Sequence, residues 1–321
     1  MRNNVVWGAF LCFIAAVSWG AMFPVAHAAF KHIDPFYFTI IRYGAVTIIL
    51  VAMLFWKEGK QAFRFEGKGL PLWFFGTMAF TVYNLFIFWG EDLMGESGVM
   101  VASIMESLMP MISIVMIWLI FNKRPYSFTF ICVIVSLIGA MFVITKGNIQ
   151  AFLGATDAIF PSILIFIAVI GWVIYTMGGS KFRGWSVLRY TTLSCLLGTI
   201  TAAVIVTAAT LFGYISIPTE EVMIATSPHL LFMIVFPGLI ALLGWNIGVS
   251  ILSPINALLF INFVPVTTLV ISIYQGNDVT MFDILGTALI ILSLLANNIF
   301  VRLQKNGYKR LVPTKLREWV S

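Results

Sequence analysis

Long apolar stretches separated by short polar segments run along the chain from Trp7 to Arg302. A bilayer-spanning α-helix needs about 20 apolar residues, and each stretch reaches that length. Transmembrane strands are excluded because they need only about 10 residues of alternating polarity. The pattern predicts ten membrane-spanning helices, over residues 7–29, 36–56, 70–90, 97–121, 126–145, 159–178, 186–212, 228–250, 254–274 and 281–302.

Landmarks of the first five stretches recur in the second five. The offsets between the paired positions are 153, 147, 155 and 154, which is close to one constant repeat length. Because each half has an odd number of crossings, the second copy is upside down relative to the first, and proteins of this design hold a substrate between the halves. The recurring pairs are Trp19-Gly20 with Gly171-Trp172, Arg42 with Arg189, Pro110 with Pro265, and Cys132/Gly139 with Gly286/Ser293.

These patterns predict an all-α polytopic membrane protein built from two inverted five-helix repeats. The first repeat covers residues 1–147, the second covers 148–303, and 304–321 form a basic tail. Composition agrees, because 60% of the residues are hydrophobic and only 10% are charged, against about 25% charged in soluble domains. The first stretch is too long for a cleavable signal peptide, and only Arg2 supplies positive charge before it.

Charge orients the predicted bundle. With the N-terminus in the cytoplasm, fifteen Lys and Arg residues fall on the cytoplasmic side, and only Lys31 and Lys146 fall on the opposite side. This asymmetry follows the positive-inside rule and places both termini in the cytoplasm. The net charge of +6 then reflects topology and attraction to anionic lipid, with no nucleic-acid footprint. The opposite loops are expected to hold Asp34, Glu91, Asp92, Glu96, Asp157, Glu220, Glu221, Asp278 and Asp283.

The arrangement resembles the drug/metabolite transporter superfamily, and specifically its EamA-like family. The resemblance rests on short loops, Trp19-Gly20 in the first helix, Pro110 and Pro265 in helices four and nine, and paired small residues in helices five and ten. Many relatives close helices four and nine with an acidic residue beside a glycine, whereas this chain has Asn122-Lys123-Arg124 at the first position. The resemblance implies a carrier of small metabolites whose cavity is lined by helices one to four and six to nine.

Glu106 is the acidic residue that stands out within the predicted spans. Nine residues after Ser97, at 1.5 Å per residue, it lies about 14 Å deep in an apolar core of about 30 Å. A charge facing lipid costs several kcal/mol, so Glu106 is expected to face the cavity. Two functional roles fit, a counter-charge for an amine and a proton site; the structural alternative is an ion pair with Arg42 or Arg189.

Other polar and aromatic residues of the spans complete the predicted lining. Trp19 and Trp172 would form matched walls or gates in the two halves, and Asn262 lies one residue from the position equivalent to Glu106. The predicted substrate-binding or coupling residues are Glu106, Asn84, Tyr83, Trp19, Trp172, Tyr175, Asn246 and Asn262.

A second set of residues is expected at gates or ion pairs. Pro24, Pro110 and Pro265 each remove a backbone hydrogen bond and kink a helix, either as hinges or as static bends. Arg42 and Arg189 lie about two turns and one turn from opposite membrane surfaces, and gate ion pairs, attraction of carboxylates and snorkelling all fit them.

The residues favour transport over catalysis. Three scattered histidines and one deep carboxylate supply no nucleophile, metal site or acid pair, so no catalytic residue, metal or cofactor is expected. No phosphate-binding motif indicates ATP-driven transport. The sequence predicts a secondary active or facilitative carrier in a bacterial inner membrane, moving an amino acid or other amine-bearing solute by alternating access. Alternatives are an exporter of hydrophobic drug-like cations and a non-transporting sensor or assembly protein; proton coupling and homodimerisation stay open.

Overall fold

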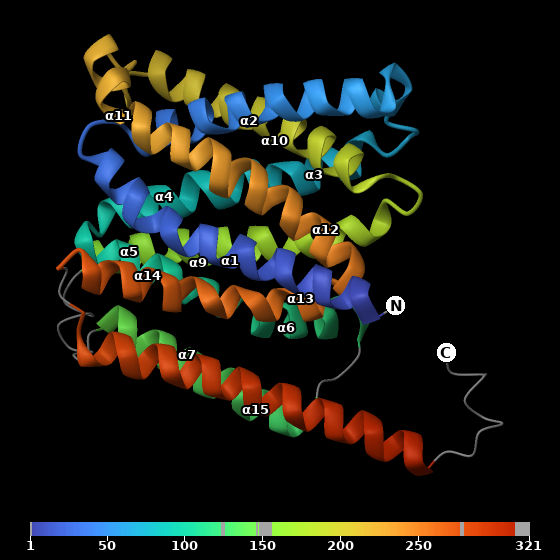
Figure 1. The fold of residues 1–321 in the computed structure, drawn as a ribbon. Coiled ribbons are helices and arrows are strands. Elements are labelled where there is room, and N and C mark those ends of the chain that lie inside the picture. The colour runs from blue at the N-terminus through green and yellow to red at the C-terminus, as the bar shows by residue number, and fades with distance from the viewer. Residues whose placement is uncertain (1, 123–125, 146, 148–155, 277–278, 312–321) are drawn as a thin grey trace.

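The computed structural model describes residues 2–122, 126–145, 147, 156–276 and 279–311. These residues form helices laid side by side, with no strand among them (Figure 1). The α-helices are α1 (Arg2–Phe30), α2 (Pro35–Glu58), α3 (Gly69–Gly76), α4 (Asn84–Leu93), α5 (Glu96–Glu106), α6 (Met109–Phe121), α7 (Ser127–Thr145), α9 (Thr156–Gly178), α10 (Val187–Leu211), α11 (Glu220–Met233), α12 (Leu242–Leu252), α13 (Pro254–Leu258), α14 (Phe263–Tyr274) and α15 (Met281–Leu311). Short 3₁₀ and π segments connect or interrupt them: η1 (Lys60–Phe63), η2 (Thr77–Tyr83), η3 (Gly179–Lys181), η4 (Ile234–Ala241) and η5 (Leu259–Asn262).

The helices have the length and apolarity of membrane spans. Within the described residues seven helical stretches qualify singly, and α5 with α6 forms an eighth if their 47° bend belongs to one span. Two further apolar helices, Ser127–Phe142 and Met281–Asn297, are shorter. The chain is therefore an all-helical, multi-pass membrane protein, as its hydrophobic pattern predicts.

The bundle has two ends of opposite charge. The end that holds the N-terminus in Figure 1 is called the basic end, and its basic residues include Lys57, Lys60, Arg64, Lys68, Lys181, Arg183 and Arg189. The other end is called the acidic end, and its described acidic residues are Asp34, Glu91, Asp92, Glu96, Glu220, Glu221 and Asp283. Several residues of the predicted loops and tail, among them 123–124, 146, 278 and 312–321, lie outside the described residues.

Several predicted boundaries were wrong: α1 begins at Arg2 and not at residue 7, the predicted fourth span is broken into α5 and α6, and α15 continues to Leu311 and not to residue 302. The eighth span was expected to begin at residue 228, but its helix begins at Glu220, where the Thr219 hydroxyl accepts a hydrogen bond from the backbone N–H of Val222. A threonine cap followed by acidic residues in the first turn is a favourable helix start. The third span was expected to end at residue 90, but α4 continues to Leu93.

These extensions move several acids out of the predicted loops. Glu91 is inside α4 with no exposed surface, so its assignment to a solvated loop was wrong. Glu220 and Glu221 form the first turn of α11. Asp283, which was counted with the loop acids although the predicted tenth span began at residue 281, is buried in the first turn of α15. The acidic end is therefore built largely from helix termini.

A π-helical segment interrupts the third helix of each half. In the first half η2 lies between α3 and α4, and in the second half η4 lies between α11 and α12. Pro237, inside η4, has no N–H to donate to the carbonyl of Met233 four residues earlier. Such segments are rare and mark functional positions more often than ordinary helix does. They give both halves a matched irregularity at the centre of the bundle.

Helices α7 and α15 form a separate pair along one side of the bundle (Figure 1). Polar contacts hold them together, with Ser136 Oγ 2.6 Å from Ser293 Oγ and the Thr129 hydroxyl donating to Asn297 Oδ1 at 2.6 Å. Gly139 lets α7 approach the carbonyl of Gly286. The small-residue patterns of helices five and ten thus serve the contact between these two helices.

Backbone-to-backbone contact also joins α3 to α10. A Cβ added to Gly76 would lie 2.2 Å from the carbonyl oxygen of Ser194, and one added to Gly198 would lie 2.2 Å from the carbonyl oxygen of Gly76. Small residues permit this close approach of helices in lipid, where van der Waals contact drives association. Since α3 comes from the first half and α10 from the second, the contact fixes the halves to each other.

We expect Gly198→Val to destabilise the purified protein, because overpacking a close contact costs about 1–3 kcal/mol or more. Gly44→Ala is the matched control, since a Cβ at Gly44 in α2 would meet nothing within 4 Å. Thermal unfolding in detergent measures both. Equal melting temperatures for the two variants would show that the α3–α10 contact is not tight.

Candidate functional site

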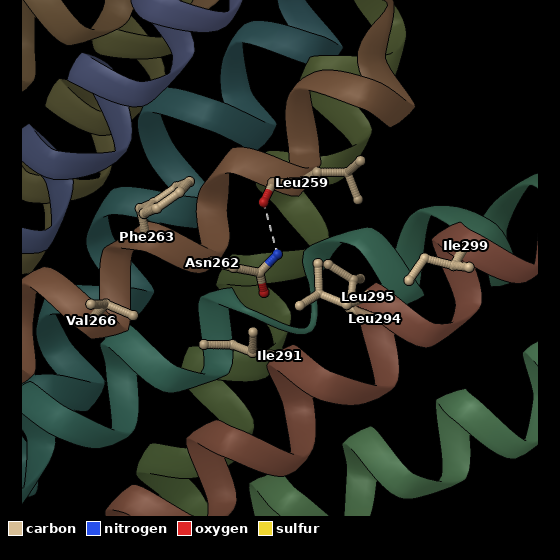
Figure 2. A pocket seen from close by; sticks show the side chains of 8 residues that line it. All are labelled: Leu259, Asn262, Phe263, Val266, Ile291, Leu294, Leu295 and Ile299. Atoms are coloured by element: carbon tan, nitrogen blue, oxygen red, sulfur yellow. Dashed lines mark hydrogen bonds between the residues drawn. The ribbon is translucent and has the colours of Figure 1, made fainter. Parts of the chain in front are cut away.

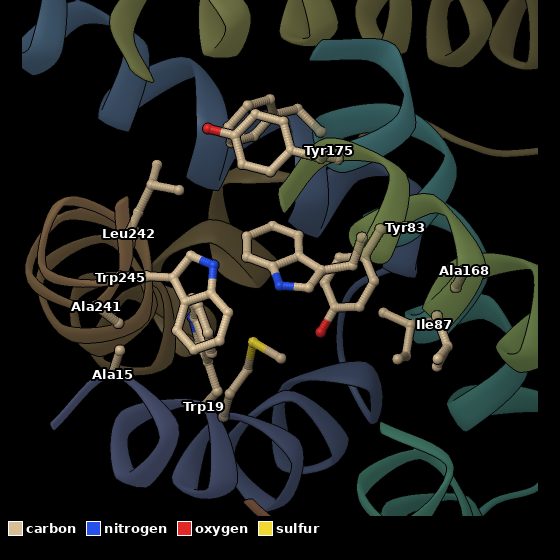
Figure 3. Packing of buried hydrophobic residues seen from close by; sticks show 14 of the residues in the cluster. Ala15, Trp19, Tyr83, Ile87, Ala168, Tyr175, Ala241, Leu242 and Trp245 are labelled. Carbon is tan, nitrogen blue, oxygen red and sulfur yellow. The ribbon is translucent and has the colours of Figure 1, made fainter. Parts of the chain in front are cut away.

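Five aromatic rings meet at the centre of the bundle. Trp172 of α9 lies 5.1 Å from Trp19 of α1, 5.0 Å from Tyr83 of η2 and 5.4 Å from Tyr175, measured between ring centres. Trp245 of α12 completes the cluster at 5.2 Å from Trp19. Figure 3 shows Trp19, Tyr83, Tyr175 and Trp245 pointing into the space between their helices. The cluster draws on both halves, where inverted repeats hold a substrate.

Glu106 touches this cluster from a helix break. It is the last residue of α5, and the chain bends by 47° before α6, which has Pro110 in its first turn. Its Oε1 accepts a hydrogen bond from the Tyr83 hydroxyl, while its Oε2 has no partner. The side chain is 1% exposed. The structural alternative of an ion pair with Arg42 or Arg189 is wrong for this conformation, because Tyr83 is the partner.

Several buried polar atoms on the helices of this cluster have no hydrogen-bond partner. Buried atoms without a hydrogen-bond partner include Glu106 Oε2, Ser107 Oγ, Asn84 Oδ1 and Trp172 Nε1. Asn84 and Ser107 directly follow Tyr83 and Glu106 in the chain. A buried polar group without a partner costs about 1–3 kcal/mol, so a ligand that bonds to these atoms recovers that energy.

A cavity at the basic end leads towards this site. It has a volume of about 300 Å³, lies against the segment between α9 and α10, and reaches Asn246 and Tyr190. The Asn246 amide donates to the Tyr175 hydroxyl at 3.0 Å, and the Tyr190 hydroxyl donates to the Tyr175 backbone carbonyl at 3.2 Å. Tyr175 packs on Trp172, so a chain of contacts joins the cavity to the aromatic cluster.

Side chains from the first half occupy the break in η4. The Arg42 Nε donates to the Met233 carbonyl at 3.2 Å, the group that Pro237 cannot bond. The Trp19 indole N–H donates to the Pro237 carbonyl at 3.3 Å. Pro237 was not among the residues predicted from the sequence, although proline followed by glycine in the middle of an apolar span is a signal for such a break.

Arg42 is buried without an ion pair among the described residues. It is 1% exposed, its Nη1 contacts Met22 Sδ at 3.5 Å, and its guanidinium lies 4.7 Å from the centre of the Tyr43 ring. Snorkelling to the headgroups is therefore wrong for Arg42.

Arg189 forms an ion pair at the basic end. Its Nη2 lies 2.7 Å from Glu66 Oε1, and its guanidinium lies 4.1 Å from the centre of the Trp185 ring. The Trp185 indole donates to Glu66 Oε2 at 2.9 Å. Hydrogen bonds from Trp185 and Arg189 hold the pKa of Glu66 below its ordinary value. This group, called the basic-end bridge (Glu66, Trp185 and Arg189), ties the connection after α2 to the start of α10.

The remaining predicted residues lie elsewhere. Asn262 ends η5, donates to the Leu259 carbonyl at 2.8 Å, and faces an otherwise apolar cavity of about 450 Å³ between α14 and α15 (Figure 2). Pro265 stands at the start of α14, and Pro24 lies inside the continuous helix α1. The structure therefore brings Asn262 to a different cavity from the one near Asn246. Within the described residues no group of three or more His, Cys, Asp or Glu is placed to hold a metal ion.

Comparisons with known proteins match this architecture. The model of the EamA-like transporter family matches residues 6–145 and 159–299, one match in each half. The uncharacterized transporter YrdR of Bacillus subtilis is 52% identical over 311 residues, covering 97% of this chain and 96% of the relative. The uncharacterized transporter YyaM of the same organism is 24% identical over 291 residues, covering 90% and 93%.

One solved structure, titled "Crystal structure of protein", shares the fold with a TM-score of 0.65 at 16% identity. The match covers 92% of this chain and 98% of the other. The repeated domain match and the 52% identical relative settle the family. The family match covers both halves of the chain, whose helices meet at the buried aromatic cluster beside Glu106. The protein therefore belongs to the EamA-like transporter family.

Proposed function

We propose that the protein is a secondary active or facilitative transporter that moves a small amine-bearing solute, such as an amino acid, by alternating access. Its ten spans form two inverted five-helix repeats in a bacterial inner membrane. The basic end faces the cytoplasm, because Lys and Arg side chains concentrate there. The family assignment supports transport, and the contacts of Glu106 support the substrate class.

The observation that carries the substrate class is the unpaired Oε2 of Glu106, a buried carboxylate oxygen whose partner oxygen accepts a hydrogen bond from Tyr83. Glu106 Oε2, Ser107 Oγ and Asn84 Oδ1 can each accept a hydrogen bond, and a primary ammonium carries three N–H donors. Aromatic faces next to a carboxylate also attract a cation. An amine entering between Tyr83 and Trp172 would therefore satisfy atoms that otherwise have no partner.

Alternating access requires the two ends to open in turn. The cavity at the basic end stops at Asn246 and Tyr190, and the rings of Tyr175 and Trp172 separate it from Glu106. Movement at the α5–α6 bend and at the two π segments would part these rings, because helix breaks absorb changes of direction. The basic-end bridge then limits how far the cytoplasmic side opens.

The second candidate is an exporter of hydrophobic cationic compounds. A cluster of five rings, one of which bonds to Glu106, favours it, since such ligands bind through aromatic contact more than through hydrogen bonds. Saturable exchange of one small metabolite supports the first function, whereas weak binding of many unrelated dyes supports the second.

A thermal-shift screen against amino acids, amines and other cations tests the substrate class. An amine that stabilises the wild type should bind Glu106→Gln about ten- to a hundredfold more weakly, because a hydrogen bond to a charged group contributes about 1.5–3 kcal/mol. Glu66→Gln, which also removes one carboxylate but at the basic end, is the control and should keep its affinity. Equal stabilisation of wild type and Glu106→Gln by every ligand would exclude Glu106 as the counter-charge.

The basic-end bridge should respond to acid. Since the folded pKa of Glu66 is depressed, its stabilising effect is present at neutral pH and is lost as the pH falls through that lowered pKa. The melting temperature of the wild type should therefore exceed that of Glu66→Gln at neutral pH, and the difference should shrink in acid. A difference that is constant with pH would show that the bridge does not stabilise the fold through this carboxylate.

A further inference from the structure

Glu91 is a second carboxyl group inside the bundle, and the transport site does not use it. It lies in the last turn of α4 near the acidic end, with 0% of its side chain exposed. Neither of its carboxylate oxygens has a hydrogen-bond partner. An ionised carboxylate without donors or a counter-ion is expensive to bury. The conformation described here therefore holds Glu91 as the neutral acid.

The charged groups around Glu91 do not offer it a partner. Asp92 on the same helix is an acid that opposes a second negative charge, and Asp34 before α2 lies close to Asp92. Glu96 begins α5, and His27 of α1 lies within reach of Lys31 and Glu96. The charged groups of these neighbouring elements are Asp34, Asp92, Glu96, His27, Lys31 and Arg42; in α9 the side chain of Asp157 is not described.

Aromatic rings lie on the inner side of Glu91. Phe88, one turn deeper on α4, packs on Phe30 at 5.6 Å and on Phe38 at 5.9 Å between ring centres. The guanidinium of Arg42 lies over the Phe88 ring at 5.8 Å. These rings pack α1, α2 and α4 together one turn deeper than Glu91. Because Glu91 lies in the last turn of α4, the shorter path for water to reach it runs from the acidic end.

Glu91 also shares an interface with the transport site. Helices α4 and α5 run antiparallel, with Tyr83 bonded to Glu106 at the deep end. At the shallow end a Cβ on Gly98 would lie 2.1 Å from the carbonyl oxygen of Glu91. The two contacts are separated by the same length on each helix, since eight residues, or about 12 Å, lie between Tyr83 and Glu91 and also between Gly98 and Glu106. The two helices therefore stay in contact from one end to the other. Separating α4 from α5 at Glu91 would open the shallow end of the interface that holds Glu106.

From this geometry we propose that Glu91 is a proton-binding site that controls opening of the acidic end. The carboxylate takes a proton from hydronium in the external medium, releases water, and becomes the neutral acid that the closed end can bury. When the proton returns to external water, the carboxylate needs hydration, and α4 and α5 separate at Gly98. The ligand is the proton itself, with no other reactant. The external direction rests on the proposed orientation of the bundle.

A cysteine-accessibility measurement tests this site without a known substrate. Val99→Cys reports opening, because Val99 is 2% exposed and follows Gly98. Ser97→Cys, at an exposed position two residues away, corrects for the reactivity of the thiol at each pH. The native cysteines Cys12, Cys132 and Cys195 are buried, so the unsubstituted protein gives a low background. Right-side-out vesicles are labelled with a membrane-impermeant maleimide.

Labelling of Val99→Cys relative to Ser97→Cys should rise by about threefold or more between about pH 5 and about pH 8 outside. Glu91→Gln, which mimics the neutral acid, should keep the ratio low at every pH. Asp92→Asn removes the neighbouring exposed carboxyl and should keep the rise. If Glu91→Gln does not accumulate in the membrane, Glu91→Asp keeps a titratable group and should still show a rise.

The same rise in Glu91→Gln, or a flat profile in the wild type or in Glu91→Asp, would overturn the proposal. Ser97→Cys tests the proposed orientation separately. If the acidic end faced the cytoplasm, Ser97→Cys would be labelled only in inverted vesicles. Failure of the amine site leaves this measurement unchanged, because the measurement contains no substrate.

Discussion

The structure depends on one constraint, which is that a polar group inside a bilayer has no water to bond with. Helices satisfy their own backbone, and problems arise only where a helix is broken. At η4 the carbonyls of Met233 and Pro237 are bonded by side chains of the other half, from Arg42 and Trp19. These hydrogen bonds satisfy carbonyls at the helix break and at the same time hold the two halves together. Glu106 Oε2 and Trp172 Nε1, which no protein group satisfies, stand out against this background as places for a ligand.

The same constraint explains why much of the fold could be predicted from the sequence. Apolar stretches of membrane length are obligatory, and the described helices follow them closely. The predicted helix boundaries were wrong mainly where polar residues form part of a helix. Glu220 and Glu221 read as loop but stabilise a helix start after Thr219, and Glu91 reads as solvated but is buried by helices brought together in three dimensions. Burial of a residue near a helix end depends on its neighbours in space, which hydropathy along the chain does not contain.

The candidate site was predictable in part for a similar reason. Depth in an apolar span identified Glu106, and duplication paired Trp19 with Trp172, which the structure places in contact. Duplication also paired Asn262 with the Glu106 position, yet Asn262 faces the cavity beside α15. Equivalent positions in two inverted repeats meet at one place only if they lie on the axis that relates the repeats. The sequence does not locate that axis, and so could not distinguish the two outcomes.

The glycine contacts between helices have a consequence for what moves and what stays together. Gly76 in the first repeat touches α10 of the second through the backbone, and Gly20 in α1 brings its helix against the Val264 carbonyl of α14. Backbone contacts of this kind leave no flexible side chain between helices to absorb sliding. If these contacts between repeats hold while α4 and α5 part at Gly98 as proposed above, each unit that shifts as a rigid body contains helices from both repeats. The sequence repeat and the group of helices that moves together are then different sets of helices. Neither half of the chain contains all the helices of one moving group.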